Sequence, residues 1–424
     1  MERNGIDLLI HNIGTLITMQ GSRGPRTGRD MSEVGAVRGG AVAIRDGIIV
    51  AAGPEDEVMA HIAGLPIMRM HDAQGLLVTP GLIDPHTHLV HGGSREHELA
   101  LKLKGMSYLE ILAQGGGILS TVRATRQATE EELYAKAKAS LDMMLSFGVT
   151  TAEAKSGYGL TLEDELKQLR VADRLNREHP VDLVSTFMGA HVVPEEYKGR
   201  SGDFVKVVIE QMLPEVKRQG LAEFCDVFCE QGVFSVEESE QILLAAKELG
   251  FGLKIHADEI EPIGGAQLAG KLGCISAEHL IAASDEGLEA MRQAGVVAVC
   301  LPATSFNLRL THHARARAMI ERGLAVALST DYNPGSSPTE SIQLVMTLGC
   351  LNLGMTPEEV LTAVTINAAH AIGRADTAGS LEAGKQADLV IFKADNLAYL
   401  PYHFGINHVH TVFKRGNVVV STGS

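Results

Sequence analysis

Two histidines that stand two positions apart, His86 and His88, end the apolar run GLIDPHTH, which is typical of a buried strand. Side chains two apart on a strand point to the same side, so both imidazoles can bind one ion. Imidazole suits zinc or iron, and His256 and Asp331, at the ends of later apolar runs, would complete four ligands. The sequence therefore predicts one metal site. A pair of hydrogen-bonded histidines is the alternative for His86 and His88 alone.

Polar residues that can do chemistry follow almost every apolar run of the chain. In a barrel of alternating strands and helices, the C-terminal ends of the strands and the loops after them build the active site. We therefore expect these residues to converge on one pocket. They are His86, His88, residues 153–158, His191, Glu230, His256, Glu259, His279 and Asp331.

The elements that must position these residues are eight short apolar runs between about residue 80 and residue 335. Helical stretches separate the runs, and two of them begin with the spacing of a capping box, Thr129 with Glu132 and Ser235 with Glu238. Nearly continuous hydrophobic runs that each precede a helix indicate parallel strands covered by helices. Eight such units predict an α/β fold, a (β/α)8 TIM-like barrel. An open doubly wound sheet is the alternative.

Both ends of the chain are rich in β-forming residues and predict a second, small domain. GAVAIRDGIIVAAG contains Asp46-Gly47, a two-residue hairpin signal, and HVHTVFKRGNVVV contains a turn at residues 415–417. Because chain termini usually lie close together, we expect one composite β-sandwich domain from residues 1–78 and 376–424, with the barrel at 79–375. The stretch GSRGPRTGRD, residues 21–30, predicts a solvated loop.

Composition excludes several classes of protein. The 424 residues are 45% hydrophobic, and they contain no apolar run near the roughly 18 residues that a membrane helix needs. A formal net charge of −15 repels nucleic acid and anionic membranes, so neither is an expected partner. Five scattered cysteines without a CxxC pair predict reduced thiols. The first residues lack the pattern of a signal peptide, which predicts a cytoplasmic protein.

The motifs carry a resemblance to a known family. VTPGLIDPHTH ahead of a barrel, two later strand-end histidines and an aspartate after the eighth run resemble the amidohydrolase superfamily of metal-dependent hydrolases. Within it, GGSRE, KSGYGL, STFMGAH, KIHADE, SAEHL and TDYNPGSSPTE resemble the imidazolonepropionase family, the ring-opening enzymes of histidine breakdown. The similarity spans nearly the whole chain.

The resemblance implies a substrate, a cofactor and an assembly. The substrate is 4-imidazolone-5-propanoate, whose cyclic amide C–N bond is hydrolysed to N-formimidoyl-L-glutamate by a metal-activated water. The resemblance also implies one divalent or trivalent metal ion per subunit, zinc or iron, and a homodimer. Some members of the superfamily bridge two metals with a modified lysine, and Lys155 is expected not to be a ligand.

Several residues are expected to bind this substrate. Arg95, in GGSRE, presents a planar fork that matches the propanoate tail, and Tyr158, in KSGYG, could bond the tail or the ring. His191 contacts the ring by the family pattern. The residues Asn333, Gly335 and Ser336 would hydrogen-bond the amide-like groups of the product. The alternatives are a surface arginine, a packed aromatic ring, a core histidine and an ordinary turn.

Three residues are predicted to be catalytic. Asp331, as ligand and acceptor, would take the proton of the water, and His279 would act with it as base or polarise the ring carbonyl. Glu259 lies three residues after His256 and would bond a ring N–H and pass a proton to the leaving nitrogen. A carboxylate that stabilises a helix start is the alternative for Glu259.

Two other functions fit part of the pattern. An aminohydrolase of the same superfamily that deaminates a nucleobase-like ring would use the same ligands, but it would have no use for Arg95. A metal-dependent protein that binds imidazole compounds without turnover would not need Glu259 and Asp331 as a proton-transfer pair.

Overall fold

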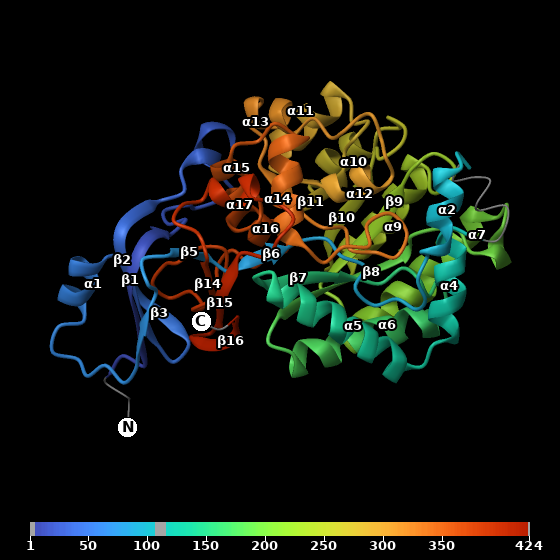
Figure 1. The fold of residues 1–424 in the computed structure, drawn as a ribbon. Coiled ribbons are helices and arrows are strands. Elements are labelled where there is room, and N and C mark those ends of the chain that lie inside the picture. The colour runs from blue at the N-terminus through green and yellow to red at the C-terminus, as the bar shows by residue number, and fades with distance from the viewer. Residues whose placement is uncertain (1–4, 107–115, 423–424) are drawn as a thin grey trace.

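The computed structural model describes residues 5–106 and 116–422, and most of them belong to a barrel of parallel strands (Figure 1). The strand order β6-β7-β8-β9-β10-β11-β12-β13 follows the chain. Each of the eight predicted runs contains one of these strands, so the predicted barrel is confirmed. The strands are β6 (Leu82–Asp84), β7 (Val149–Lys155), β8 (Asp182–Ala190), β9 (Phe224–Cys229), β10 (Gly252–Ala257), β11 (Ser276–His279), β12 (Val297–Cys300) and β13 (Val326–Leu328).

One backbone hydrogen bond and the side chain of Asp84 join the first and last strands of the barrel. The N–H of His88 donates to the carbonyl of Tyr332 at 2.8 Å, just beyond both strand ends. Below this contact, Asp84 accepts hydrogen bonds from the N–H of Thr330 at 3.1 Å and from its hydroxyl at 2.6 Å. Ser329 also donates to Asp84. The sequential order and this junction exclude an open doubly wound sheet.

Helices cover the outside of the barrel, and the predicted capping boxes at Thr129 and Ser235 are confirmed, with a third at Thr356. Pro357 occupies the first turn of the helix that Thr356 opens, where its missing N–H costs nothing. The helices of the barrel region are α2 (His97–Leu103), α4 (Ile118–Gln127), α5 (Glu130–Ser146), α6 (Leu162–Glu178), η2 (Glu195–Tyr197), α7 (Ser201–Val207), η3 (Val208–Met212), α8 (Leu213–Gln219), α9 (Val236–Glu248), α10 (Gly265–Leu272), α11 (Asp285–Ala294), α12 (Pro302–Asn307), α13 (Ala316–Glu321), α14 (Ile342–Leu351), α15 (Pro357–Ala363) and α16 (Ile366–Ala371).

The two ends of the chain form one mixed sheet beside the barrel, where the blue and red strands lie side by side (Figure 1). Its order is β16-β15-β14-β5-β1-β2-β3, and β4 pairs with β1. The pairing of β14 with β5 joins the two ends, and one apolar core contains side chains from both halves, as a sandwich requires. The elements are β1 (Leu8–Ile17), η1 (Gly28–Ser32), β2 (Ala36–Arg45), β3 (Ile48–Pro54), α1 (Glu55–His61), β4 (Met70–Asp72), β5 (Leu77–Pro80), β14 (Leu389–Phe392), α17 (Tyr399–Tyr402), β15 (Val409–Lys414) and β16 (Asn417–Ser421).

Both predicted hairpins form. Asp46 and Gly47 have φ values of 52° and 75°, the left-handed conformation that a tight two-residue turn requires. The second turn is shorter than predicted, because Asn417 already pairs with Lys414 and only Arg415 and Gly416 lie outside the ladder. The domain boundaries at residues 78 and 375 stay a prediction. None of the described helices has the length and hydrophobicity that a membrane crossing requires.

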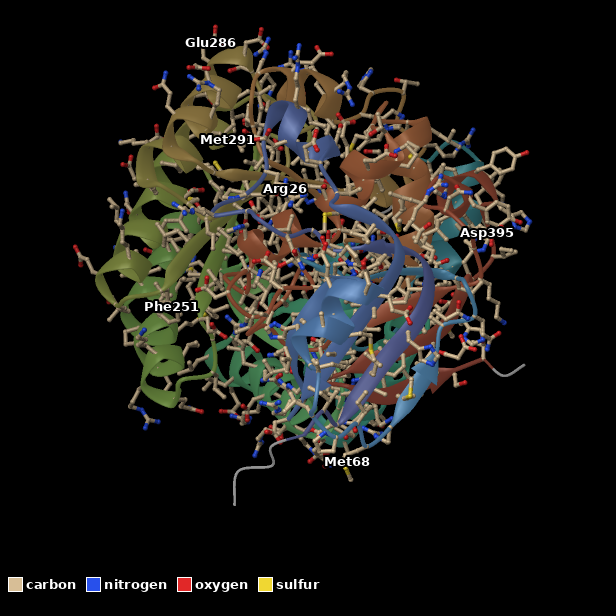
Figure 2. The ribbon with its side chains drawn as sticks, turned by 90° about the vertical axis from the view of Figure 1, so that its left-hand side faces the viewer. Arg26, Met68, Phe251, Glu286, Met291 and Asp395 are labelled. Atoms are coloured by element: carbon tan, nitrogen blue, oxygen red, sulfur yellow. The ribbon has the colours of Figure 1, made fainter. Side chains whose placement is uncertain are left out.

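The expectation of a solvated loop at residues 21–30 was wrong for Arg26. This side chain is buried between the small sheet and the barrel (Figure 2). Its guanidinium donates to the carbonyls of Met19 and Gln20 at 2.8 Å, and its backbone N–H donates to the amide oxygen of Asn367 on α16 at 2.7 Å. The carbonyls come from six and seven residues earlier in the chain, whereas the contact with Asn367 is made by a distant segment that no local pattern indicates.

Close packing of the small sheet leaves no space for a side chain at Gly14. A Cβ on Gly14 in β1 would lie 1.9 Å from the backbone oxygen of Gly75. We expect Gly14→Ala to lower the free energy of unfolding by about 1–3 kcal/mol, since overpacking forces the backbone to move. Gly53→Ala in β3 is the matched control, because no atom lies within 4 Å of the added carbon. Thermal unfolding of the two variants measures the difference, and equal melting temperatures would contradict the prediction.

Candidate metal and active site

The structure brings the four predicted metal ligands together at the carboxyl ends of the strands. Oδ1 of Asp331 lies 3.4 Å from Nε2 of His86 and 3.8 Å from Nε2 of His88. The ring of His256 has its centroid 4.5 Å from that of His86. His279 lies beside them, with its ring centroid 5.1 Å from that of His256, and ligand atoms of His86, His256 and His279 all lie within 4.8 Å of one another. None of these side chains is more than 4% exposed.

The donor set fits a metal ion. Within residues 5–106 and 116–422, no hydrogen-bond partner reaches either ring nitrogen of His86 or Nε2 of His256. Unsatisfied buried nitrogens are costly, and a cation among them would satisfy them. Burial, with neighbouring positive groups, holds the pKa of His86, His88 and His279 well below the usual range. These imidazoles are therefore neutral, which is the form that binds a metal.

Asp226, in the middle of β9, contacts Nδ1 of His256. Its Oδ2 lies 3.0 Å from Nδ1 of His256, and its Oδ1 accepts the backbone N–H of the same residue at 3.1 Å. A carboxylate in this position fixes the tautomer of the imidazole and turns Nε2 toward the other ligands. Sequence reasoning missed this residue. The available signal was one charged letter inside the apolar run EFCDVFCE.

Lys155 forms ion pairs with Asp226 and with Glu153. Its Nζ donates to Oδ2 of Asp226 at 2.6 Å and lies 3.0 Å from Glu153. Burial alone would lower the pKa of Lys155, but Asp226 and Glu153 outweigh it and raise the pKa above the ordinary value. The ammonium is therefore charged and occupied by two carboxylates, which supports the expectation that Lys155 is not a metal ligand.

The same ionic network extends to two further strands. Nζ of Lys254 lies 3.0 Å from Glu153 and 3.7 Å from Glu278, and all of these side chains are fully buried. We refer to Glu153, Lys155, Asp226, Lys254 and Glu278 as the buried ionic network. Each charge has an opposite neighbour, as ionised groups in an apolar interior require.

The predicted catalytic carboxyls lie beside the ligands. Glu259 Oε1 is 3.6 Å from Nδ1 of His279, and the Glu259 side chain is 15% exposed. Burial, and secondarily the nearby Asp331, raise the pKa of Glu259 to about 8. Burial also raises the pKa of Asp331 to about 6, although Thr304 donates to it at 2.5 Å.

The alternative reading of Glu259 as a stabiliser of a helix start is wrong. Helix α10 begins only at Gly265, and its first N–H groups donate to Asp258. Glu259 lies in the loop ahead of the helix. Glu230, another strand-end residue, accepts the N–H of Ile260 at 2.8 Å and so holds that loop.

Arg95 is buried, which excludes the alternative of a surface arginine. Its side chain is 8% exposed and forms a bidentate pair with Glu98, at 3.0 Å from Nε and 2.8 Å from Nη2. The guanidinium also lies against Gly335, because a Cβ built on that glycine would fall 2.0 Å from Nη1. The loop after Asp331 therefore adjoins the predicted tail-binding residue.

Aromatic rings line the site on the side of β6 and β8. His191 stacks on His88 with centroids 4.8 Å apart and planes at 12°, and Tyr158 lies 5.2 Å from His191. Burial lowers the pKa of His191 to about 3, so its ring is neutral. His91, which sequence reasoning missed, lies 6.2 Å from Tyr158, and burial lowers its pKa to about 3 as well.

Asn333 bonds within its own loop. Its Oδ1 accepts the N–H groups of Gly335 and Ser336, each at 2.8 Å, and its Nδ2 donates to the carbonyl of Asp331 at 2.7 Å. These are the bonds of the ordinary turn that was the alternative. A contact of Asn333, Gly335 and Ser336 with a ligand stays a prediction.

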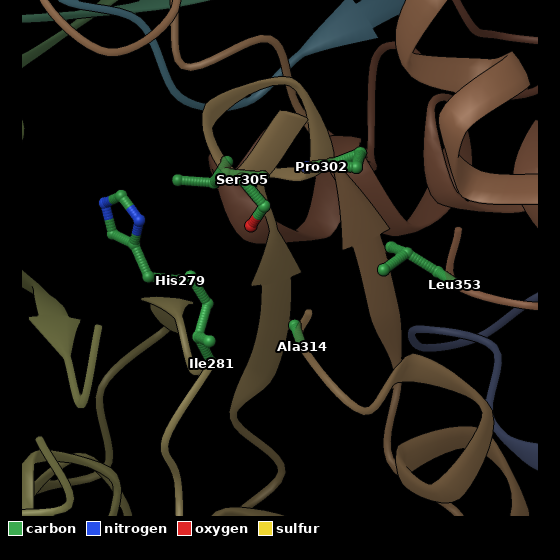
Figure 3. A pocket seen from close by; sticks show the side chains of 7 residues that line it. His279, Ile281, Pro302, Ser305, Ala314 and Leu353 are labelled. Carbon is green, nitrogen blue, oxygen red and sulfur yellow. The ribbon is translucent and has the colours of Figure 1, made fainter. Parts of the chain in front are cut away.

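A narrow crevice opens on the other side of His279, between β11 and β12 (Figure 3). Ile281, Pro302, Ser305 and Leu353 line it with His279. It is too narrow to admit a water molecule, so a substrate does not fit in it.

Comparisons with known proteins identify the family. The model of the "Amidohydrolase family" matches residues 77–419. The imidazolonepropionase of Alkaliphilus metalliredigens is 59% identical over 421 residues, which cover 99% of both chains. The chain belongs to the imidazolonepropionases of the amidohydrolase family. A further member, from Bacillus cereus, is 56% identical over 418 residues, covering 99% of this chain and 98% of the other.

Solved structures share the fold at low identity. An adenosine deaminase from Xanthomonas campestris with bound zinc has a TM-score of 0.71 at 18% identity and covers 99% of this chain and 94% of its own. A 5-methylcytosine deaminase from Klebsiella pneumoniae has a TM-score of 0.73 at 17% identity and covers 98% of both. At such identities the likeness shows the architecture alone.

The position of Asp226 generates a test of the metal site. We expect Asp226→Asn to weaken the binding of zinc or iron about 10- to 100-fold, because the amide no longer fixes the tautomer of His256. Competition with a chelator of known affinity measures the binding. Asp203→Asn, a change on the exposed surface of α7, is the control and should leave the affinity unchanged. An unaltered affinity in Asp226→Asn would refute the positioning of His256.

Proposed function

We propose that this chain hydrolyses the cyclic amide C–N bond of 4-imidazolone-5-propanoate to N-formimidoyl-L-glutamate, with one zinc or iron ion. The observation that carries the proposal is the buried Arg95 beside the loop of Asp331, in a chain 59% identical to an imidazolonepropionase. A positive fork beside a metal-binding cluster suits a small ring with a carboxylate tail. Glu98 pairs with Nε and Nη2 of Arg95, and a neutral nucleobase would offer no carboxylate to the remaining Nη1.

The residues that would hold the metal are His86, His88, His256 and Asp331. A bound zinc or iron ion would act as a Lewis acid that lowers the pKa of a water molecule toward about 7. His279 is neutral and lies beside this group, so it can donate one N–H to the ring carbonyl. Asp331, with a pKa of about 6, can accept the proton of the attacking water.

Glu259 is suited to return a proton to the leaving nitrogen. A group with a pKa of about 8 is mostly protonated at neutral pH, so Glu259 carries the proton that the departing amide nitrogen needs. The oxygen of water joins the ring carbonyl carbon, the C–N bond breaks, and the nitrogen takes this proton. Asp331 and Glu259 thus act as proton acceptor and proton donor.

The substrate supplies a direct test of the proposed function. We expect the metal-loaded chain to remove the chromophore of 4-imidazolone-5-propanoate and a chelator to stop the loss. Arg95→Ala should raise KM at least about 10-fold, because a charged hydrogen bond to the tail is lost. Ultraviolet absorbance follows both reactions. An Arg95→Ala variant with an unchanged KM would refute the tail-binding role, and no turnover at all would refute the function.

The role of Glu259 has its own test. We expect Glu259→Gln to lower kcat about 10²- to 10⁴-fold with little change in KM, since an amide cannot deliver the proton. Glu261→Gln, two residues on and exposed, keeps the loop and serves as the control. Steady-state kinetics at saturating substrate measure kcat. An unchanged kcat in Glu259→Gln would contradict this assignment.

We also propose that two copies of the chain associate. Tyr402, Phe404 and Ile406, in and after α17, are 80%, 63% and 49% exposed. Large apolar side chains so near one another favour a covered surface. We expect sedimentation to give twice the mass of one chain, and the pair Tyr402→Asp and Phe404→Asp to give one. A monomer for the unaltered chain would refute this proposal.

A further inference from the structure

Glu98 binds the edge of the Arg95 guanidinium that Nε and Nη2 form. Its two oxygens accept hydrogen bonds from Nε and Nη2 in a parallel pair, at 3.0 and 2.8 Å. The Glu98 side chain is only 1% exposed. Such a bidentate pair fixes the plane of the guanidinium as well as its position.

Glu98 is itself anchored. It lies in the first turn of α2, and its Oε1 also accepts the backbone N–H of Gly117, ahead of α4, at 2.7 Å. An acidic residue is favourable at the start of a helix. The carboxylate is therefore tied to two segments of backbone and can serve as a fixed support for Arg95.

Gly335 bounds the guanidinium on the opposite side. A Cβ on Gly335 would lie 2.0 Å from Nη1 of Arg95, so any larger residue at this position would displace the guanidinium. The hydrogen bonds that the described residues make to Arg95 use Nε and Nη2. Within residues 5–106 and 116–422, Nη1 therefore lies beside the loop of Asp331 and receives no hydrogen-bond partner.

We propose that Glu98 is a positioning residue that aims Nη1 of Arg95 at the carboxylate tail of the substrate. The inference rests on the proposed function. Because Glu98 offsets the charge of Arg95, the tail is recognised through two directed N–H groups rather than through a free positive charge. The site would accordingly select a planar carboxylate at a set distance from the ring.

The test compares two substrates that differ only in the charge of the tail. We expect Glu98→Gln to raise KM at least 10-fold for 4-imidazolone-5-propanoate, with kcat changed less than twofold. For the same ring with the tail converted to a propanamide, KM should not change. Glu96→Gln, the same substitution at an exposed position that bonds Ser94, is the matched control and should alter neither substrate.

A double variant separates positioning from a general structural role. In an Arg95→Ala background, Glu98→Gln should have no further effect on KM, because the group that it positions is absent. Glu98→Asp, which keeps the charge but shortens the reach, should raise KM in the same direction and supports the reading if Glu98→Gln folds poorly.

Three results would overturn the proposal: a lower or unchanged KM in Glu98→Gln, an equal rise for both substrates, or an additive effect in the double variant. If the unaltered chain does not hydrolyse the propanoate, the proposed function fails by itself. Calorimetric binding of imidazole propanoate then tests the positioning alone, with at least 10-fold weaker binding expected in Glu98→Gln and equal binding overturning it.

Discussion

The contact between Lys155 and Asp226 is the interaction on which the geometry of the site depends. Asp226 orients His256, and it remains ionised in the barrel interior because His256 and Lys155, 3.0 Å and 2.6 Å away, both lower its pKa. Lys155 in turn needs Glu153, and Glu153 is shared with Lys254. The buried ionic network thus links strands β7, β9, β10 and β11. A shift of any one strand would leave a charge unpaired, so the network fixes the register of the barrel at the place where the ligands emerge.

Exclusion of water from the site lowers the pKa of histidine side chains and raises the pKa of carboxyl groups. Burial lowers the pKa of His86, His88 and His279, which leaves these three imidazoles uncharged, whereas Asp226 raises the pKa of His256. The same burial raises the pKa of Glu259 to about 8 and of Asp331 to about 6. Burial thus keeps three imidazoles neutral and leaves Glu259 mostly protonated at neutral pH. The stacked rings of His88 and His191, with the tilted ring of Tyr158, form one side of this buried environment.

Features with a local pattern were predictable from the sequence, and features made by distant partners were not. The eight strands, the capping boxes at Thr129 and Ser235 and the hairpin at Asp46 follow from periodicity and turn chemistry. The convergence of His86, His256 and Asp331 follows from their common place at strand ends. The role of Asp226 escaped notice because its partners His256 and Lys155 lie on other strands. Glu98 lies only three residues after Arg95, and this local pair was missed. Arg26 bonds carbonyls six and seven residues before it, but its contact with Asn367 on α16 has no local pattern.

The mixed sheet beside the barrel has a consequence for the order of events during synthesis. Strands β1 to β5 leave the ribosome first, but β5 obtains its antiparallel neighbour β14 only after some three hundred further residues have been made. Until then one edge of the nascent sheet is open to wrong partners. The barrel lies between the two halves in the chain, so its residues are made before the halves can meet. A polypeptide that terminates early would thus lack the closing strands, and its unfinished edge would distinguish it from the complete molecule.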